Sequence, residues 1–451
     1  MRIERNPRTA SSVAPFQGII TGAPDIAFMT TMLSELIALD TSFPPGTGYP
    51  AMADLLERLC APLGGDSERI EVPEHLWAAP GVEGARVNLI VRPDMGSAAP
   101  PNLPEAMIYF HVDTAPVGDG WTRPPLRLTV EDDRLYGRGT ADMKGTIVAV
   151  LDALTRLKAS GAPLAFRPVL AFCTDEEGGL YPGIRHLAET RPLPDVLLNL
   201  NGSAEPRIWA GCLGSMDFSL AIEGRAAHSG TPQLGVNAIE AAIPALAALD
   251  RLKADIEIRT TTMSPPPNAD GPLRARLTVT AIHAGDKGSA VPGHCRITVN
   301  RRYLPEEEPG AVEAEIRAAL DAALATTAAL GWTLEQVGHL PPVVDPDGPA
   351  TDRWTAARAA AFGLPLSAFT RYGSGTSSDF GWVQRAGQKH MLLGGLSRPG
   401  RNVHAADEHT TAGDLVDLSR AVELFLSAEF DPADPAFENS TPAHIQKGPR
   451  P

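Results

Sequence analysis

Histidine and carboxylate side chains that could bind a metal ion occur at separated places in the chain. His111 and Asp113 follow an apolar run, Glu176 and Glu177 follow another, and His404 lies in a polar loop near the C-terminus. Imidazole and carboxylate groups bind Zn²⁺ and Mn²⁺, and a bound cation lowers the pKa of a coordinated water toward about 7. A neighbouring carboxylate can then take the proton. These residue types predict metal-assisted hydrolysis, provided that the fold brings them together.

Apolar runs and helical periodicity indicate the elements that must position these side chains. Strands are expected at residues 69–72, 87–91, 107–110, 169–173, 196–200 and 391–393, and helices at 26–37, 52–63, 147–157 and 415–430. His111, the Glu176–Glu177 pair and Asn201 each follow a strand directly, and His404 lies in the loop after another. Alternating strands and helices predict an α/β fold with a mostly parallel sheet and helices on both faces. Ligands of such sheets gather at the carboxyl ends of the strands.

The pattern changes at about Gly214. From there to residue 340 the expected order is strand, helix, strand, strand, helix, strand, which indicates an inserted α+β unit of about 120 residues. We therefore expect one domain formed by residues 1–213 and 341–430, which contains the candidate metal ligands, and an inserted domain at 214–340. Residues 431–451 are rich in Pro, Ala and polar residues and are expected to form a flexible tail.

Length and composition bound the class of protein. A chain of 451 residues exceeds what one hydrophobic core organises, and 43% hydrophobic with 21% charged residues is typical of a globular protein. The net charge of -15 argues against nucleic-acid binding, which needs clustered Lys and Arg. No secretory signal and no apolar run of about 20 residues is present, so we expect a cytoplasmic protein without a membrane span. The four cysteines form no CxxC pair and are expected to be reduced core residues.

Several motifs together resemble a known family. They are His111-Val112-Asp113, the run Gly137–Gly145 (GRGTADMKG), Asp175-Glu176-Glu177-Gly178, and the run Gly224–Gly230 (GRAAHSG). In this order and at these intervals they resemble the metallo-hydrolases that include glutamate carboxypeptidase, aminoacylase, acetylornithine deacetylase and succinyl-diaminopimelate desuccinylase. The resemblance extends from about residue 26 to residue 430. It implies a hydrolase of carbon–nitrogen bonds that uses one or two divalent ions, Mn²⁺ or Zn²⁺.

The resemblance also implies a metal-ligand set. His111 would bind one ion, Asp142 would bridge two, and Glu177 and His404 would complete the other site. Asp113 would orient His111 from behind, as carboxylates do for metal-bound imidazoles.

Further residues receive roles in catalysis and substrate binding from the same resemblance. Glu176 would be the general base that moves a proton from the attacking water to the leaving nitrogen. The inserted domain at 214–340 would be a lid and dimerisation domain of the catalytic metal-binding domain. Its His228 would reach the active site of the partner subunit and stabilise the oxyanion, which implies a homodimer. Arg302 would bind a substrate carboxylate, because a planar guanidinium matches that group. Ser377 lies in a pocket-lining loop where relatives often have Asp.

One position departs from the family pattern in a way that affects metal binding. Relatives have Glu or Asp where counting along the strand places Asn201, and a neutral amide is a weaker ligand. Glu205 occurs four residues later and could substitute. Three arrangements follow: two ions with Glu205, two ions with one loosely bound, or a single ion held mainly by Asp142, Glu177 and His404. The strand register favours Asn201 and therefore the single ion.

Three functional hypotheses result. The first is a metal-dependent hydrolase that cleaves an amide, N-acyl amino acid or peptide bond of a small substrate bearing a carboxylate. The second is an aminohydrolase that removes an amino group from an aromatic acid such as 5-nitroanthranilate, because Asn300 and Ser377 replace Asp residues of relatives. The third, motivated by Asn201, is a non-catalytic metal- or ligand-binding relative. The presence of the base and the principal ligands favours the first.

Overall fold

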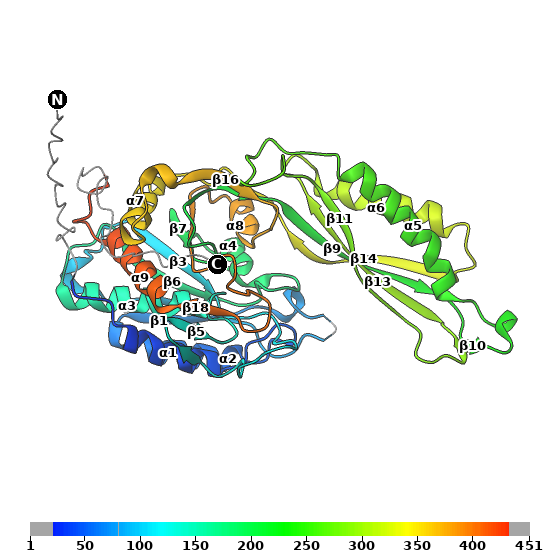
Figure 1. Cartoon of the computed structure of the whole chain (residues 1–451), viewed down its shortest axis with the longest axis horizontal. Helices are drawn as coiled ribbons and strands as arrows, with labels where there is room; N and C mark the ends of the chain where they lie inside the picture. Colours follow the sequence, from blue (N-terminus) through cyan, green and yellow to red (C-terminus); the bar gives the residue numbers. More distant parts are fainter. Residues whose placement is uncertain (1–20, 80, 433–451) are drawn as a thin grey trace, which may run out of the picture.

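The computed structural model describes residues 21–79 and 81–432 and contains two bodies (Figure 1). The larger body is built on a six-stranded sheet. In spatial order its strands are β1 (Asp66–Glu71), β2 (Val87–Arg92), β6 (Arg167–Cys173), β3 (Glu105–His111), β7 (Val196–Asn199) and β17 (Met391–Leu393). The last four run parallel, and β2 is antiparallel to both β1 and β6. The expected mostly parallel sheet is confirmed.

Helices cover both faces of this sheet. They are α1 (Ile26–Ala38), α2 (Tyr49–Cys60), α3 (Lys144–Ser160), α4 (Pro182–Thr190), α7 (Thr351–Ala361), α8 (Phe380–Arg385) and α9 (Ala412–Leu426). Along β3, Ile108 and Phe110 join the core cluster that includes α1, α3 and α9, whereas Met107 and Tyr109 join the cluster that includes α4 and α8. Alternate side chains of one strand are therefore buried on opposite faces, as in a doubly covered sheet.

Short strands that the sequence did not predict add two small sheets. One consists of β15 (Val343–Val344), β8 (Arg207–Cys212) and β16 (Thr370–Ser374), and the other of β18 (His409–Thr411), β5 (Arg134–Tyr136) and β4 (Thr129–Glu131). Five short 3₁₀ turns are also described: η1 (Ala61–Leu63), η2 (Glu74–Leu76), η3 (Gly96–Ala98), η4 (Pro232–Leu234) and η5 (Leu366–Ala368). Strands of two to six residues are too short to give a clear periodic pattern. They matter here because β18 and β16 place the loops that contain His404 and Ser377.

The second body, called the lid here, contains a four-stranded antiparallel sheet. Its strands in spatial order are β11 (Arg276–Ala284), β13 (His294–Tyr303), β9 (Gly214–Glu223) and β14 (Gly331–Leu340). Helices α5 (Ala238–Ile256) and α6 (Pro309–Leu324) pack on one face and share a core with alternate residues of β9 and β13. The short pair β10 (Ala227–His228) and β12 (Ala290–Val291) lies at the end of the lid far from the larger body (Figure 1).

Other expectations concern the cysteines, the tail and membrane spans. All four cysteines are buried and free, as predicted. Beyond residue 432, the tail expected at 431–451 lies outside the described residues. None of the helices in the described part of the chain has the length and apolar character needed to cross a bilayer.

His339, near the end of β14, joins the lid to the larger body. Its Nε2 lies 2.8 Å from Tyr303 Oη, and its ring packs edge to face against Trp382 of α8, with 5.2 Å between centroids. The Trp382 indole also donates to the His339 carbonyl at 2.9 Å. Burial, with smaller contributions from Arg385 and Arg185, lowers the pKa of His339 from 6.5 to about 4.

This depressed pKa predicts a pH-dependent contribution to stability. Between pH 6.5 and about 4, His339 is protonated in the unfolded chain and neutral in the folded chain. The free energy of unfolding therefore decreases as the pH falls through this range. We expect His339→Gln to lose less stability than the wild type between pH 7 and pH 4.5. Urea unfolding at both pH values measures this, and an equal loss in the two proteins would contradict it.

Candidate active site

The site begins at the carboxyl ends of β3 and β6. The two strands are parallel and place His111 opposite Cys173, so the loops that follow them lie side by side. The Glu177 backbone N–H donates to Asp113 Oδ2 at 2.8 Å, and Glu177 Oε1 accepts from the Ala115 N–H at 3.0 Å. These two hydrogen bonds hold the second glutamate of the pair beside the end of β3.

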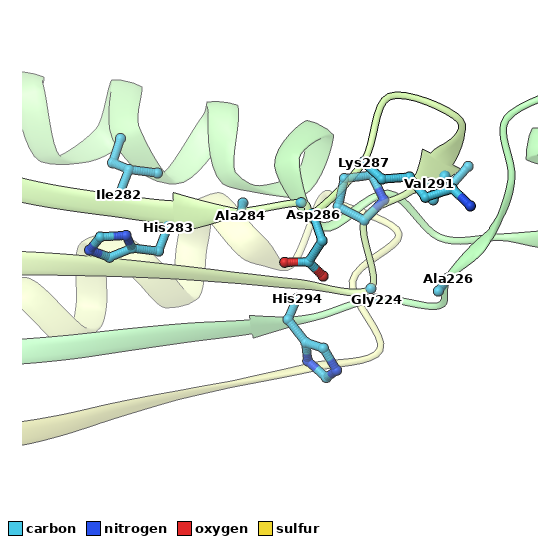
Figure 2. A pocket seen from close by; sticks show the side chains of 13 residues that line it. Gly224, Ala226, Ile282, His283, Ala284, Asp286, Lys287, Val291 and His294 are labelled. Carbon is cyan, nitrogen blue, oxygen red and sulfur yellow. The ribbon is translucent and has the colours of Figure 1, made fainter. Parts of the chain in front are cut away.

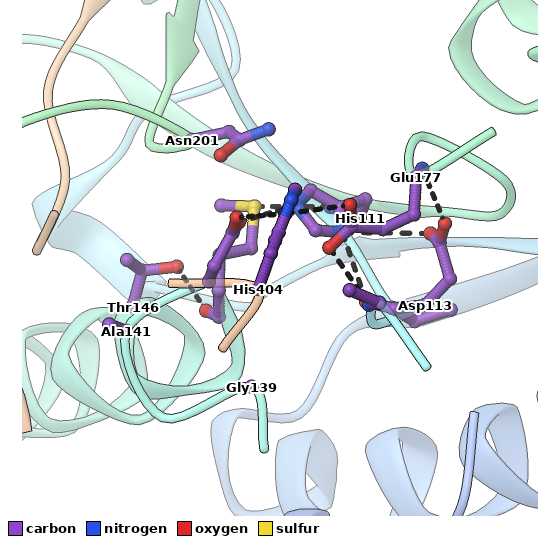
Figure 3. Close-up of polar contacts among 12 residues, drawn as sticks. His111, Asp113, Gly139, Ala141, Thr146, Glu177, Asn201 and His404 are labelled. Atoms are coloured by element: carbon purple, nitrogen blue, oxygen red, sulfur yellow. Dashed lines mark hydrogen bonds and ion pairs between the residues drawn. The ribbon is translucent and has the colours of Figure 1, made fainter. Parts of the chain in front are cut away.

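Four predicted ligands come together here (Figure 3). His111 Nε2 lies 3.1 Å from Asp142 Oδ1, and His404 Nε2 lies 3.2 Å from Asp142 Oδ2. His404 Nε2 is also 2.9 Å from Glu177 Oε2. Ligand atoms of His111, Asp142 and Glu177 all lie within 4.8 Å of one another. Asp142 thus lies between the two imidazoles, with one carboxylate oxygen toward each.

His111 has an orientation that suits a metal ligand. Its ring is buried, with Nδ1 3.1 Å from the Asp113 carbonyl and 3.5 Å from Asp113 Oδ1. Asp113 Oδ1 is itself buried without a hydrogen-bond partner among the described residues. If Nδ1 carries the proton and donates to Asp113, the lone pair of Nε2 is available inside the cluster. The contacts of Asp113 therefore match the supporting role expected for it.

The electrostatics of the cluster also suit a cation. Burial raises the pKa of Glu176 well above its usual range, and Asp379, Glu177 and Asp142 raise it further. Hydrogen bonds to Asp142 and Glu177 raise the pKa of His404 to about 10. Several carboxylates therefore lie close together. The side chains of Asp142 and Glu177 are little exposed, whereas the His404 side chain is 55% exposed. A divalent ion would supply the missing positive charge, and imidazole with carboxylate is a donor set that Mn²⁺ and Zn²⁺ accept.

The two candidates for a further ligand lie in different surroundings. Asn201 follows β7, and in Figure 3 its carboxamide points toward the histidines without a drawn contact. The carboxylate of Glu205 instead lies within electrostatic range of Arg207 and Tyr372. Burial lowers the pKa of Arg207 and raises that of Tyr372, and Glu205 makes a smaller contribution to each. Among the described residues, Glu205 does not belong to the group of His111, Asp142 and Glu177 whose ligand atoms lie within 4.8 Å of one another. This placement agrees with the strand register that put Asn201 at the edge of the sheet.

The predicted substrate-binding residues and His228 are placed differently. Arg302 of β13 donates from Nη1 to Ser377 Oγ at 2.7 Å, which joins the lid to the loop after β16. His228 is exposed on β10, where its Nδ1 accepts from the Gly230 N–H at 2.9 Å. Within one chain, β10 lies at the distal end of the lid (Figure 1). The fold therefore does not bring His228 to the metal cluster of its own chain.

Sequence reasoning missed Glu408. Its buried carboxylate accepts from the backbone N–H groups of Gly139, Ala141 and Asp142 at 2.9–3.1 Å, and from Arg138 Nη1 at 2.7 Å. Glu408 therefore ties the loop of Asp142 to the loop of His404. Glu408 follows the candidate ligand His404 by four residues, which could have drawn attention to it. Its hydrogen-bond partners, however, could be identified only in the folded structure.

Sequence reasoning also missed Asp379, at the start of α8. The carboxylate is buried, accepts a hydrogen bond from the Tyr109 hydroxyl, and lies close enough to raise the pKa of Glu176. Burial raises the pKa of Asp379 itself to about 6. The position is two residues from Ser377, in the loop where a carboxylate was expected in relatives.

Known proteins are similar to this chain over most of its length. Residues 107–428 match the model of peptidase family M20/M25/M40. The succinyl-diaminopimelate desuccinylase of Alkalilimnicola ehrlichii is 29% identical over 405 residues, covering 87% of this chain and 96% of that protein. The enzyme of the same name from Xanthomonas oryzae pv. oryzae is 30% identical over 326 residues, covering 70% and 81%. The solved structure of the Saccharomyces cerevisiae di-peptidase Dug1p has a similar fold, with a TM-score of 0.70 and 14% identity over 90% of this chain and 99% of that one.

Proposed function

Because the chain belongs to peptidase family M20/M25/M40 and is a metal-dependent hydrolase of carbon–nitrogen bonds, we propose that it cleaves a small amide bearing a carboxylate. The observation that carries this proposal is the placement of Arg302 beside Ser377, where a lid guanidinium faces the domain that contains the metal cluster. A planar guanidinium can bind a carboxylate through two hydrogen bonds. The similar desuccinylases, whose name denotes removal of a succinyl group, support an N-acyl substrate.

The residues of the cluster would have two different roles, metal binding and proton transfer. Asp142, Glu177 and His404 would hold the principal metal ion, with His111 as a further ligand on the other side of Asp142. When bound, the metal supplies an acidified water and polarises the amide carbonyl. Glu176 makes no hydrogen bond to the described residues, and burial raises its pKa. It would accept the proton of the attacking water and pass it to the leaving nitrogen.

For the metal content we propose a single tightly bound Mn²⁺ or Zn²⁺, held mainly by Asp142, Glu177 and His404. The neutral Asn201, which follows β7 at the same edge of the sheet as His111, supports this count. We predict that Asn201→Asp will raise the number of ions retained after dialysis from one to two, because a carboxylate can complete a second site with His111. Elemental analysis of the dialysed protein measures the count. Glu205→Gln is the control and should retain one ion, whereas an unchanged count in Asn201→Asp would contradict the assignment.

We also propose that the chain forms a homodimer through the lid, with the domain division at 214–340. Exposed apolar side chains gather on α5 and on the edge strand β11, including Ile243 (61% exposed) and Ile282 (50% exposed). Beside them, a hollow of about 730 Å³ is lined by residues such as His283, Asp286 and His294 (Figure 2). A second copy on this surface would let His228 act at the partner's metal cluster. The molar mass in solution tests the assembly, and a monomer would contradict it.

A hydrolysis screen tests the proposed reaction. The Mn²⁺-supplemented protein is offered N-acyl amino acids, dipeptides and aminobenzoates, and the release of amine or ammonia is measured. Hydrolysis of N-acyl amino acids that stops when the metal is chelated supports the proposal. Release of ammonia from aminobenzoates alone would instead support the aromatic aminohydrolase, for which the departures at Asn300 and Ser377 are the motivation. The location in the cytoplasm stays a prediction.

A further inference from the structure

The chain changes direction sharply between the end of β6 and the glutamate pair. Asp175 has a φ angle of +54°, in the left-handed region. Residues other than glycine adopt this conformation at a cost, Asn and Asp more readily than others, and it persists where the surrounding structure holds it. The side chain of Glu176, which follows, makes no hydrogen bond within residues 21–79 and 81–432. The direction of Glu176 therefore depends on the backbone of residues 175–179, called the base loop here.

Two residues from earlier in the chain hold the carboxylate of Asp175. Arg86, directly before β2, donates from Nε to Oδ2 at 2.7 Å, and Tyr49, the first residue of α2, donates from its hydroxyl to Oδ1 at 2.5 Å. Arg86 is fixed in turn, because its Nη1 donates to the Gly84 carbonyl at 2.9 Å and its Nη2 to the Pro45 carbonyl at 3.1 Å. Both oxygens of Asp175 are thus engaged, one of them in a charge-assisted bond, which leaves this buried side chain little freedom.

The ion pair of Arg86 with Asp175 is enclosed. Both side chains are buried, and the guanidinium carbon lies 4.5 Å from the centre of the Trp77 ring and 5.2 Å from that of the Tyr49 ring. A guanidinium packs well on aromatic faces, and a buried ion pair is screened less by salt than an exposed one. Among the described residues, Asp175 is the only carboxylate that forms an ion pair with Arg86. The charge of Arg86 is therefore balanced by the residue directly before the proposed base.

The other end of the base loop packs against Phe43. A Cβ added at Gly178 would lie 3.1 Å from the Phe43 ring, and one added at Gly179 would lie 2.7 Å from it, so the ring packs directly on the backbone. The Phe43 N–H donates to the Thr114 carbonyl at 2.9 Å, which fixes Phe43 beside the loop that follows β3. The base loop is therefore held at both ends, and the two glutamates lie between these contacts.

The two glutamates differ in how they are held. Glu177 has hydrogen bonds of its own, from its N–H to Asp113 and from the Ala115 N–H to its carboxylate. Glu176 has none, although its carboxyl lies close enough to Asp142 for that carboxylate to raise its pKa. A disturbance of the turn before the pair should therefore displace Glu176 and leave Glu177 in place.

We propose that Arg86 is a positioning residue for the general base. Through its ion pair with Asp175 it keeps the base loop in the left-handed turn from which Glu176 reaches the metal cluster. Among the described residues, Arg86 makes no hydrogen bond or ion pair with any of the four metal ligands, so its effect on turnover passes through Asp175. This inference rests on the proposed function, in which Glu176 moves the proton.

A variant that removes the charge of Arg86 is compared with a matched control. Arg86→Met keeps most of the side-chain length and removes the ion pair. Arg156→Met removes a comparable buried arginine of α3, which pairs with Asp152 and Glu423 and has no contact with the base loop. Both proteins are loaded with Mn²⁺ and offered an N-acyl amino acid that the wild type hydrolyses. The comparison separates loss of a buried ion pair in general from loss of this particular one.

The kinetic constants should differ between the two variants. We expect kcat to decrease roughly 10- to 100-fold in Arg86→Met, because misplacement of a catalytic group by about 1 Å can have this effect. KM should change by less than about threefold, and the metal content should be unchanged, because Glu177 keeps its own hydrogen bonds. Arg156→Met should lose stability and keep its kcat per folded molecule. An unchanged kcat in Arg86→Met, or loss of its metal, would overturn the proposal.

Further variants show whether Arg86 acts through Asp175. In the double variant Arg86→Met/Asp175→Asn, kcat should be no lower than in the more affected single variant, because both changes remove the same contact. A decrease equal to the product of the two single effects would overturn the proposal. Tyr49→Phe removes only the second hydrogen bond to Asp175 and keeps the buried ring, so it tests the same carboxylate if Arg86→Met does not fold. Its kcat should also decrease at an unchanged metal content, and a wild-type kcat would overturn the proposal.

Hydrogen exchange separates this inference from the proposed reaction, because it requires no turnover. Mass spectrometry measures the exchange of backbone amides in a peptide that covers residues 174–181. We expect faster exchange in Arg86→Met than in the wild type and in Arg156→Met. Equal exchange in the three proteins would overturn the inference even if amides are hydrolysed. If exchange is faster but the wild type hydrolyses none of the amides, the contact of Arg86 with the base loop is supported and the proposed function alone fails.

Discussion

Replacement of Glu176 by Gln is expected to lower kcat by roughly 10²- to 10⁴-fold while the metal remains bound. The carboxyl lies among His111, Asp142, Glu177 and Asp379, which all act on its pKa, yet it makes no hydrogen bond to the described residues. A half-buried carboxylate that accepts no hydrogen bond is free to accept a proton and is therefore suited to acid–base work. The amide has nearly the same shape but cannot take the proton. Steady-state kinetics and metal content of the same preparation measure the two effects.

Two other glutamates serve as controls for this prediction. Glu177→Gln should lose metal as well as activity, because Glu177 contacts His404 within the ligand group. Glu205→Gln should change neither, because its carboxylate acts on Arg207 and Tyr372 instead. Retained turnover in Glu176→Gln would show that another group is the base, and loss of its metal would show that Glu176 is a ligand.

The second large effect is expected at Glu408. Glu408→Ala leaves the buried Arg138 without its carboxylate and removes the acceptor of three backbone N–H groups, including that of Asp142. Removing one partner of a buried ion pair typically costs about 3–5 kcal/mol. We expect a decrease of this size in the free energy of unfolding, together with weaker Mn²⁺ binding, because the loops of Asp142 and His404 lose their connection. Urea unfolding measures the free energy of unfolding, and calorimetric titration measures the affinity for Mn²⁺.

The adjacent Asp407 offers a matched control. Its carboxylate accepts from Thr122 in a more exposed position, so Asp407→Asn should cost less than about 1 kcal/mol. If Glu408→Ala folds stably and binds Mn²⁺ as tightly as the wild type, the proposed positioning of Asp142 is wrong. If stability alone decreases, Glu408 supports the fold without organising the metal cluster.

The fold class, and the set of residues that gather at one edge of the sheet, could be predicted from the amino-acid sequence alone. Long buried runs such as 107–110 and 169–173 identified β3 and β6, and a ligand directly after such a strand must lie at its carboxyl end. The position of a residue directly after a strand is enough to predict this, because the carboxyl ends of parallel strands lie at the same edge of the sheet. His111 and Glu177 meet for that reason.

Contacts between residues far apart in the sequence could be identified only in the folded structure. The strands that carry the Asp142 and His404 loops are three residues long, too short for periodicity to reveal their pairing, so the bond of Glu408 to the Asp142 loop was not predictable. The contact of Arg302 with Ser377 likewise depends on how the lid sheet lies against the larger body. Such contacts depend on how separate elements pack against one another. The ends of buried strands, in contrast, can be located from the pattern of apolar residues in the sequence.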